Sequence, residues 1–173
     1  MTALADEGAA VDGWQRAVDA VWAEAVALGE DEVIRRIDAL AAELPSSDPR
    51  GPFEAAGARD SAGREADAEG EYRRALELGL AGRARTEALV QLASTVRTLG
   101  RASESVELLA EAAVEPHDLG DAITAFRALA LVSLGQERRA AAELLAALAP
   151  HLPQYRRSLL AYAGALEGDA PSA

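Results

Sequence analysis

The chain has 173 residues, which is enough for one domain with a core of its own. Half of the residues are apolar and only 4% are aromatic, with alanine and leucine the most frequent, a composition that favours packed helices over a β-sandwich. Cysteine is absent and all 17 basic residues are arginine, which excludes disulfides, cysteine-ligated metal ions and chemistry that needs a lysine. The net charge of −12 argues against binding to a nucleic acid backbone or to an anionic membrane surface.

The first residues of the chain are acidic, whereas a targeting segment begins with basic residues ahead of an apolar stretch. No apolar run approaches the roughly 18–20 residues that a membrane-spanning helix requires. We therefore expect a cytoplasmic protein.

The apolar periodicity predicts nine helices. In chain order they are expected near residues 11–28, 31–44, 50–62, 64–79, 82–99, 101–114, 119–134, 136–149 and 153–167. Residues 1–10 and 168–173 are small or polar and carry glycine or proline, so we expect a disordered tail at each end. A single all-α domain over residues 11–167 follows from this pattern.

Four glycines divide the helices at nearly equal intervals. Gly29, Gly63, Gly100 and Gly135 are 34, 37 and 35 residues apart, and each stands between two apolar-periodic stretches. Glycine ends a helix at low cost because it adopts the left-handed conformation freely. The interval is close to the 34 residues of a tetratricopeptide unit. The sequence thus predicts helical hairpins, with repeats near 11–45, 50–80, 82–116 and 119–150 and a capping helix over 153–167.

Small residues recur at two positions after these glycines, as expected where two helices cross closely. Five residues after each glycine stand Ile34, Ala68, Ser105 and Ala140, and twelve residues after each stand Ala41, Ala75, Ala112 and Ala147. One turn after the first small site a bulky residue is expected. Tyr72, Leu109 and Leu144 fit, whereas Asp38 does not, so the first repeat is degenerate.

A family resemblance is carried by three blocks of sequence within residues 48–166. They are DPRGPFEAAGARDSAGREADAEGEYRRALELGLAG, EALVQLASTVRTLG and LPQYRRSLLAYA. The blocks resemble small bacterial proteins of the tetratricopeptide repeat family. The resemblance implies a right-handed superhelix, or α-solenoid, of antiparallel helical hairpins that binds other proteins. It transfers no catalytic residues to this chain.

The sequence offers few groups for catalysis. His117 and His151 are the two histidines, and neither has a second candidate metal ligand nearby. There is no Glu-x-x-His pair and no Gly-x-Ser-x-Gly elbow. We therefore predict a protein that is not an enzyme and that holds no metal ion and no cofactor.

In a tetratricopeptide array the first helix of each hairpin lines the concave surface. The residues expected to project into this groove stand at the same distances along the chain before each turn glycine. In the second and third repeats they include the polar candidates Glu54, Gly57, Asp60, Ser61, Gln91, Ser94, Arg97 and Thr98. In the fourth repeat the equivalent positions are Ala125, Phe126, Leu129, Val132 and Ser133, mostly apolar. Two interpretations stay open: a polar floor that hydrogen-bonds a peptide or a small ligand, or solvated residues of an exposed helical face, with Asp60 and Arg97 paired.

The last helix and the tryptophans add three expectations. Tyr155, Leu159, Tyr162 and Leu166 fall on one stripe, which we expect to dock on the preceding hairpin. Arg156 either reaches the groove and binds a carboxylate of the partner or pairs with acidic residues nearby. Trp14 and Trp22 are eight residues apart and are expected in the core.

Together these features predict a non-catalytic module that binds a protein or peptide in its concave groove. The acidic surface favours a neutral or basic partner, and we expect a monomer or a weak homodimer. An alternative is a structural protein that dimerises through an end hairpin, and a third possibility is small-molecule binding or a cryptic enzyme site. Polar residues around a cleft would favour the groove, whereas an apolar patch at one end would favour the dimer.

Overall fold

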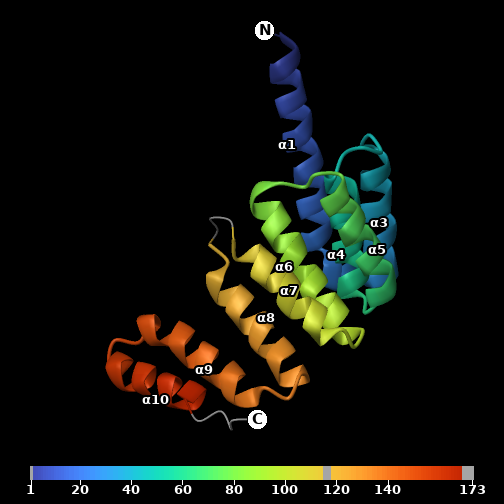
Figure 1. The fold of residues 1–173 in the computed structure, drawn as a ribbon. Coiled ribbons are helices and arrows are strands. Elements are labelled where there is room, and N and C mark those ends of the chain that lie inside the picture. Colours follow the sequence, from blue (N-terminus) through green and yellow to red (C-terminus); the bar gives the residue numbers. More distant parts are fainter. Residues whose placement is uncertain (1, 115–117, 169–173) are drawn as a thin grey trace. The chain divides into compact units, whose positions relative to one another are not determined.

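Helices make up nearly all of the computed structural model, which describes residues 2–114 and 118–168, with side chains from residue 13 onward (Figure 1). They are α1 (Thr2–Ala23), α2 (Ala25–Leu28), α3 (Glu30–Ala42), α4 (Arg50–Ser61), α5 (Glu65–Glu77), α6 (Gly82–Thr98), α7 (Ala102–Ala112), α8 (Gly120–Ser133), α9 (Glu137–Leu148) and α10 (Arg156–Gly168), with a 3-10 turn, η1 (Ala149–His151), after α9. No strand occurs in these described ranges, so the all-α prediction is confirmed. None of the described helices is both long and apolar enough to cross a membrane.

The two ends of the chain differ from the expectation. Helix α1 begins at Thr2, inside the expected tail over residues 1–10, because this segment is rich in residues that favour helices. The expected first helix is also divided, since Glu24 has a non-helical backbone between α1 and α2. At the other end α10 includes Gly168, and the rest of the expected tail, residues 169–173, lies outside the described residues, as does His117.

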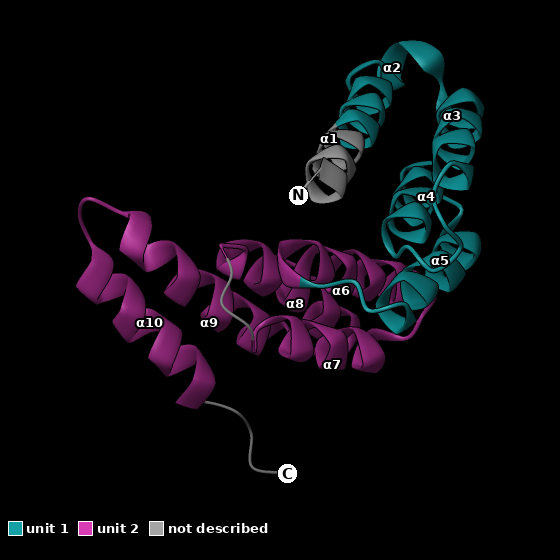
Figure 2. Ribbon diagram, turned by 90° about the horizontal axis from the view of Figure 1, so that it is seen from above, with its two compact units in different colours: residues 1–81 teal, residues 82–173 magenta. Residues whose placement is uncertain are grey.

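The structure divides into two compact units, residues 1–81 with α1 to α5 and residues 82–173 with α6 to α10 (Figure 2). In the first unit α3 packs on α4 and α4 on α5. In the second unit each helix from α6 to α10 packs on the next, and α6 also contacts α8. Packing between consecutive helices is that of a helical-repeat solenoid. The single domain over residues 11–167 stays a prediction.

The turn glycines adopt the predicted conformation. Gly63, Gly100 and Gly135 have φ values of 66°, 84° and 72°. The residue after each of them donates its backbone N–H, at 2.9 Å, to the carbonyl oxygen five positions earlier. This is the Schellman arrangement, which satisfies carbonyl groups at the end of a helix and needs a residue with positive φ.

The small residues that follow the turn glycines are almost fully buried in the middle hairpins and more exposed towards the two ends of the chain. At the first site Ala68, Ser105 and Ala140 are at most 2% exposed, and at the second Ala75 and Ala112 are at most 1% exposed. Ala41 and Ala147 are only half-buried. The bulky site behaves in the same way, because Tyr72 and Leu109 are fully buried whereas Leu144 is 43% exposed. The last hairpin is therefore packed less tightly than the two before it.

The first unit has a core in which α1 packs against α3. Trp14 and Val18 of α1 pack with Ile34 and Ile37 of α3. The indole N–H of Trp14 donates to the carbonyl oxygen of Leu40 at 2.9 Å. The predicted place of Trp14 in the core is confirmed, and Trp22 lies partly buried at its edge.

The stripe expected on the last helix was partly wrong. Ala163 is the buried residue of α10, and Leu159 and Leu166 are half-buried beside it. Tyr155 and Tyr162, in contrast, are 77% and 66% exposed. Because the buried side of α10 centres on Ala163, Tyr162 points past the edge of its contact with α9, and Tyr155 lies ahead of the helix with a φ of 68°.

We predict that Ala75→Leu and Ala112→Leu each lower the free energy of unfolding by about 1–3 kcal/mol, because a fully buried crossing has no room for a larger side chain. Ala147→Leu is the matched control, since the same position in the last hairpin is only half-buried. Urea unfolding followed by circular dichroism measures all three. Equal losses in the three variants would contradict this description of the crossings.

We also predict that Ser105→Ala raises the free energy of unfolding by about 1 kcal/mol, because a buried hydroxyl without a partner costs about that much or more. The Ser105 side chain is 1% exposed, and its oxygen has no hydrogen-bond partner in the described structure. Ala68 and Ala140 show that alanine fits the same place in the other hairpins. Ser103→Ala, on the exposed side of α7, should leave the stability within a few tenths of a kcal/mol.

Candidate functional site

The polar groove candidates of α4 are engaged inside the first unit. Glu54 accepts a hydrogen bond from the indole N–H of Trp22 at 2.9 Å. Burial raises the pKa of the Tyr72 phenol far above its usual range, and the charges of Asp60 and Glu54 raise it further. Both carboxylates therefore lie close enough to the buried hydroxyl of Tyr72 for their charges to act on it.

The remaining candidates on α4 offer little to a ligand. Gly57 is half-buried in the helix. The hydroxyl of Ser61 donates to the carbonyl oxygen of Ala58 at 3.0 Å, within its own helix. Phe53 packs against Tyr72 with ring centroids 6.4 Å apart. In the first unit these groove candidates thus serve mainly to hold α4 against its neighbours.

On α6 the candidates are as accessible as those on α4. Gln91 and Ser94 are half-buried, and Thr98 is exposed with its hydroxyl donating to the carbonyl oxygen of Ser94 at 3.2 Å. Arg97 is half-buried, and its Nε atom is buried without a hydrogen-bond partner in the described part of the chain. Asp60 belongs to the other unit, so the pairing of Asp60 with Arg97 stays a prediction.

The apolar groove positions of α8 are the open ones. Leu129 and Val132 are each 49% exposed, and Ala125 is exposed one turn before Leu129. We call these three residues the α8 stripe. Val90, the position on α6 equivalent to Ala125, is in contrast only 6% exposed. It lies on the side of α6 that its neighbours cover.

Arg156 is the first residue of α10 and is exposed, as is Arg157. The expected pairing with acidic residues is not seen for either one among the described residues. The histidine that the structure describes, His151, pairs through Nε2 with an Asp121 oxygen at 3.0 Å, and both side chains are more than half exposed. This exposed pair lacks the enclosed setting of a catalytic acid or base.

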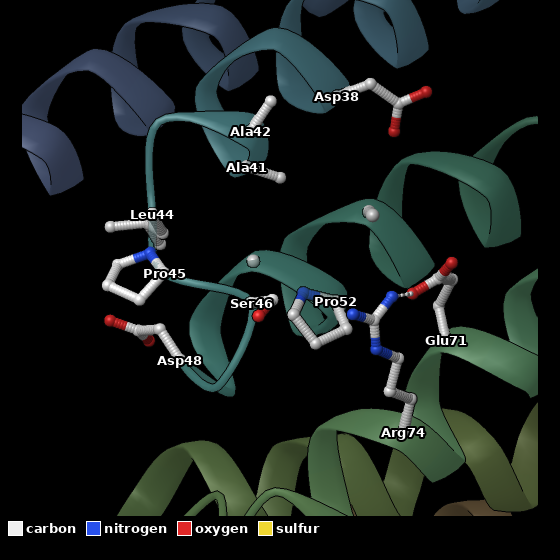
Figure 3. A pocket seen from close by; sticks show the side chains of 12 residues that line it. Asp38, Ala41, Ala42, Leu44, Pro45, Ser46, Asp48, Pro52, Glu71 and Arg74 are labelled. Carbon is white, nitrogen blue, oxygen red and sulfur yellow. Dashed lines mark ion pairs between the residues drawn. The ribbon is translucent and has the colours of Figure 1, made fainter.

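The first unit has an open cavity of about 410 Å³ that was not predicted from the sequence (Figure 3). It is lined by the end of α3, by residues 43–49 and by parts of α4 and α5. Small residues such as Ala41 and Pro52 contribute to its wall, with carboxylates from Asp38, Asp48 and Glu71. Asp38 was the one signal in the sequence, since a carboxylate replaces the bulky residue expected there.

Arginines largely neutralise the carboxylates of this cavity. Asp38 accepts two hydrogen bonds from the Arg59 guanidinium, at 2.9 and 3.0 Å. Asp48 accepts hydrogen bonds from Arg50, which hold the pKa of its carboxyl below the usual range. Figure 3 shows the third pair, Glu71 with Arg74, at a longer 4.0 Å. The cavity walls include no histidine and no hydroxyl nucleophile activated by a base.

A family model described as tetratrico peptide repeat matches residues 49–166, more than half of the chain. The chain belongs to the tetratricopeptide repeat family. The comparisons with curated proteins and with solved structures find no match. Tetratricopeptide repeats are typically non-catalytic and present extended surfaces to other proteins. Membership therefore indicates the class of function, a protein interaction module.

We predict that Asp38→Asn lowers the free energy of unfolding by about 1 kcal/mol, because Arg59 is 21% exposed and would lose its paired charge. Asp31→Asn is the control, since the pair of Asp31 with Arg64 is far more exposed and should contribute only a few tenths of a kcal/mol. Urea unfolding at neutral pH compares the two. A larger loss in Asp31→Asn would contradict the importance of the Asp38 pair.

Proposed function

We propose that this chain is a non-catalytic interaction module that binds an extended segment of another protein along the concave side of its first helices. The observation that carries the proposal is the α8 stripe, because apolar side chains are exposed at the positions where the repeat places its groove. A cytoplasmic location is part of the proposal, as the sequence analysis expects.

Exposed apolar groups in a row mark places where another surface removes them from water. Leu129 and Val132 are three residues apart on α8, so their side chains lie on the same face of the helix. Burial of one leucine side chain contributes roughly 1.5–3 kcal/mol, and a half-exposed one retains part of that gain for a partner. The stripe therefore fits a segment with two or three apolar side chains.

Arg97 supplies the polar part of this surface. Arg97 stands three residues before its turn glycine and Ser94 six, which are the offsets of Val132 and Leu129 before theirs. Because α6 and α8 are in contact, equivalent residues on the two helices are neighbours along the groove. The Arg97 guanidinium has no ion pair among the described residues, and its positive charge would attract a carbonyl or carboxylate oxygen of the bound segment.

The charge of the chain adds attraction at longer range. With a net charge of −12, the protein draws neutral or basic partners and repels acidic ones. We thus favour a partner segment that is apolar where it covers the α8 stripe, presents an oxygen to Arg97 and carries a neutral or positive charge overall.

We predict that Leu129→Asp and Arg97→Ala each remove the captured partner when the tagged protein is used as bait in its native lysate. Arg97→Ala should cost about 2 kcal/mol or more of binding free energy, as expected for a desolvated charged contact, and should alter folding by less than about 0.5 kcal/mol. Leu129→Asp should cost about 1 kcal/mol of stability, because Leu129 is half-buried, and should still fold. Quantitative mass spectrometry of the captured proteins measures the loss.

Val26→Asp is the matched control, because Val26 is fully exposed on α2 and receives the same kind of substitution. The partner must remain with Val26→Asp and disappear with Leu129→Asp. A partner that persists with both α8 and α6 variants would refute the groove proposed here.

A further inference from the structure

The cavity of the first unit combines an apolar wall with carboxylates from three different segments of the chain. Its volume of about 410 Å³ falls within the roughly 300–1,000 Å³ of pockets that hold small organic groups. Leu44 and Pro45 ahead of α4, and Pro52 and Ala55 on α4, supply part of the wall. Methylene groups pack against such a wall while a charge at their end reaches a polar partner.

The three carboxylates of the cavity differ in how their oxygens are used. Asp38 and Asp48 each accept hydrogen bonds on both oxygens from the guanidinium of one neighbouring arginine. Glu71 is 31% exposed and accepts no hydrogen bond from the described residues, and the ion pair it makes there, with Arg74, is 4.0 Å long. Since a carboxylate has about four lone-pair sites, Glu71 has the greatest capacity left for a donor.

Arg74 is held only loosely at this cavity. Figure 3 shows its side chain extending from α5 toward Glu71. The side chain is 53% exposed, and it makes no hydrogen bond among the described residues. Exposed ion pairs of this kind contribute little to stability. Displacement of Arg74 from Glu71 by a better-placed cation therefore costs little.

Glu71 and Asp38 act on the same place although they belong to different helices. The hydrogen bonds that Arg59 donates to Asp38 raise the pKa of its guanidinium, and the charge of Glu71 raises it further. Both carboxylates therefore lie near one guanidinium. The Asp38 side chain is 43% exposed, so its remaining lone pairs are open to a second donor. A cation that reaches Glu71 is attracted by both groups.

The charge of the whole unit selects the sign of a ligand. Residues 1–81 have a formal net charge of −10, from 8 Arg and 18 Asp or Glu. Such an excess attracts cations at long range and repels anions. Among cations, the planar guanidinium donates two parallel hydrogen bonds to a carboxylate, as Arg59 does to Asp38, whereas an ammonium group does not.

We infer that this cavity binds the side chain of an arginine that belongs to another protein. The guanidinium takes the place of Arg74 at Glu71, and the methylene groups of the same side chain cover the apolar wall beside Pro52. The site lies in the first unit and uses neither the α8 stripe nor Arg97. It therefore goes beyond the proposed function and does not depend on it.

Titration of the isotope-labelled full chain with N-acetylarginine amide, followed by amide NMR spectra, tests this inference. The amide signals of cavity residues such as Ser46 and Gly51 should shift and saturate, with a dissociation constant on the order of millimolar. N-acetylcitrulline amide has nearly the same shape but no charge and should cause no saturable shift. Free L-arginine carries a carboxylate that the acidic unit repels, so it should bind more weakly than the amide.

Two pairs of variants locate the site. Glu71→Gln should raise the dissociation constant by roughly tenfold, because a charge-assisted pair is lost. Glu77→Gln, an exposed position on the same helix, should change it by less than about twofold. Arg74→Ala should lower the dissociation constant by roughly threefold, since the competing cation is gone. Arg73→Ala removes the same charge from α5, but Arg73 pairs with Glu69 at 2.8 Å, so its effect should be smaller.

Circular dichroism checks that each variant keeps its helix content, and Glu71→Ala replaces Glu71→Gln if that variant does not fold. Leu129→Asp should bind N-acetylarginine amide as the unmodified chain does, so failure of the cavity and failure of the groove are separable. An absence of saturable shifts at about 100 mM ligand overturns the inference. So do equal effects of Glu71→Gln and Glu77→Gln, an Arg74→Ala variant that binds no better, or binding of the citrulline compound with similar affinity. Tighter binding of free L-arginine would overturn the assignment to a protein side chain.

Discussion

The close approach of the two helices in each hairpin is the constraint on which the rest of the structure depends. It is met where small side chains stand at the crossing, and Ala75 and Ala112 are accordingly almost fully buried. In the last hairpin the same constraint is relaxed, because Ala147 is half-buried and Leu144 is 43% exposed. Apolar side chains of the second unit, such as Leu129, Val132 and Leu144, are correspondingly in contact with water.

The first unit uses its charge differently. Several of its carboxylates are paired with arginines of the same unit, as in the hydrogen bonds from Arg35 and Arg36 that lower the pKa of the Glu32 carboxyl to about 2. A carboxyl with a lowered pKa stabilises the fold above its unfolded pKa and loses that contribution only as the pH falls through the folded value. These pairs therefore persist in mildly acidic solution. The excess negative charge that remains acts at long range on approaching partners.

The second unit differs from the first in the side chains that it exposes. Leu129 and Val132 of α8 are each 49% exposed, and Arg97 of α6 has no ion pair among the described residues. These two observations are the basis of the proposal that this unit binds a segment of another protein.

The sequence by itself determined the helices and their limits, because these depend on local features such as the turn glycines, helix propensity and apolar periodicity. From Glu30 to the end of α10 every boundary lies within three residues of its expected place. Only the tertiary structure decided which side chains remain open. Val90 and Leu129 occupy comparable helical faces, yet one is 6% and the other 49% exposed. The cavity beside Asp38 and the hydrogen bond from Trp22 to Glu54 could likewise not be predicted from the sequence. Each depends on neighbours distant along the chain, and local patterns hold no information about which distant residues will cover a given face.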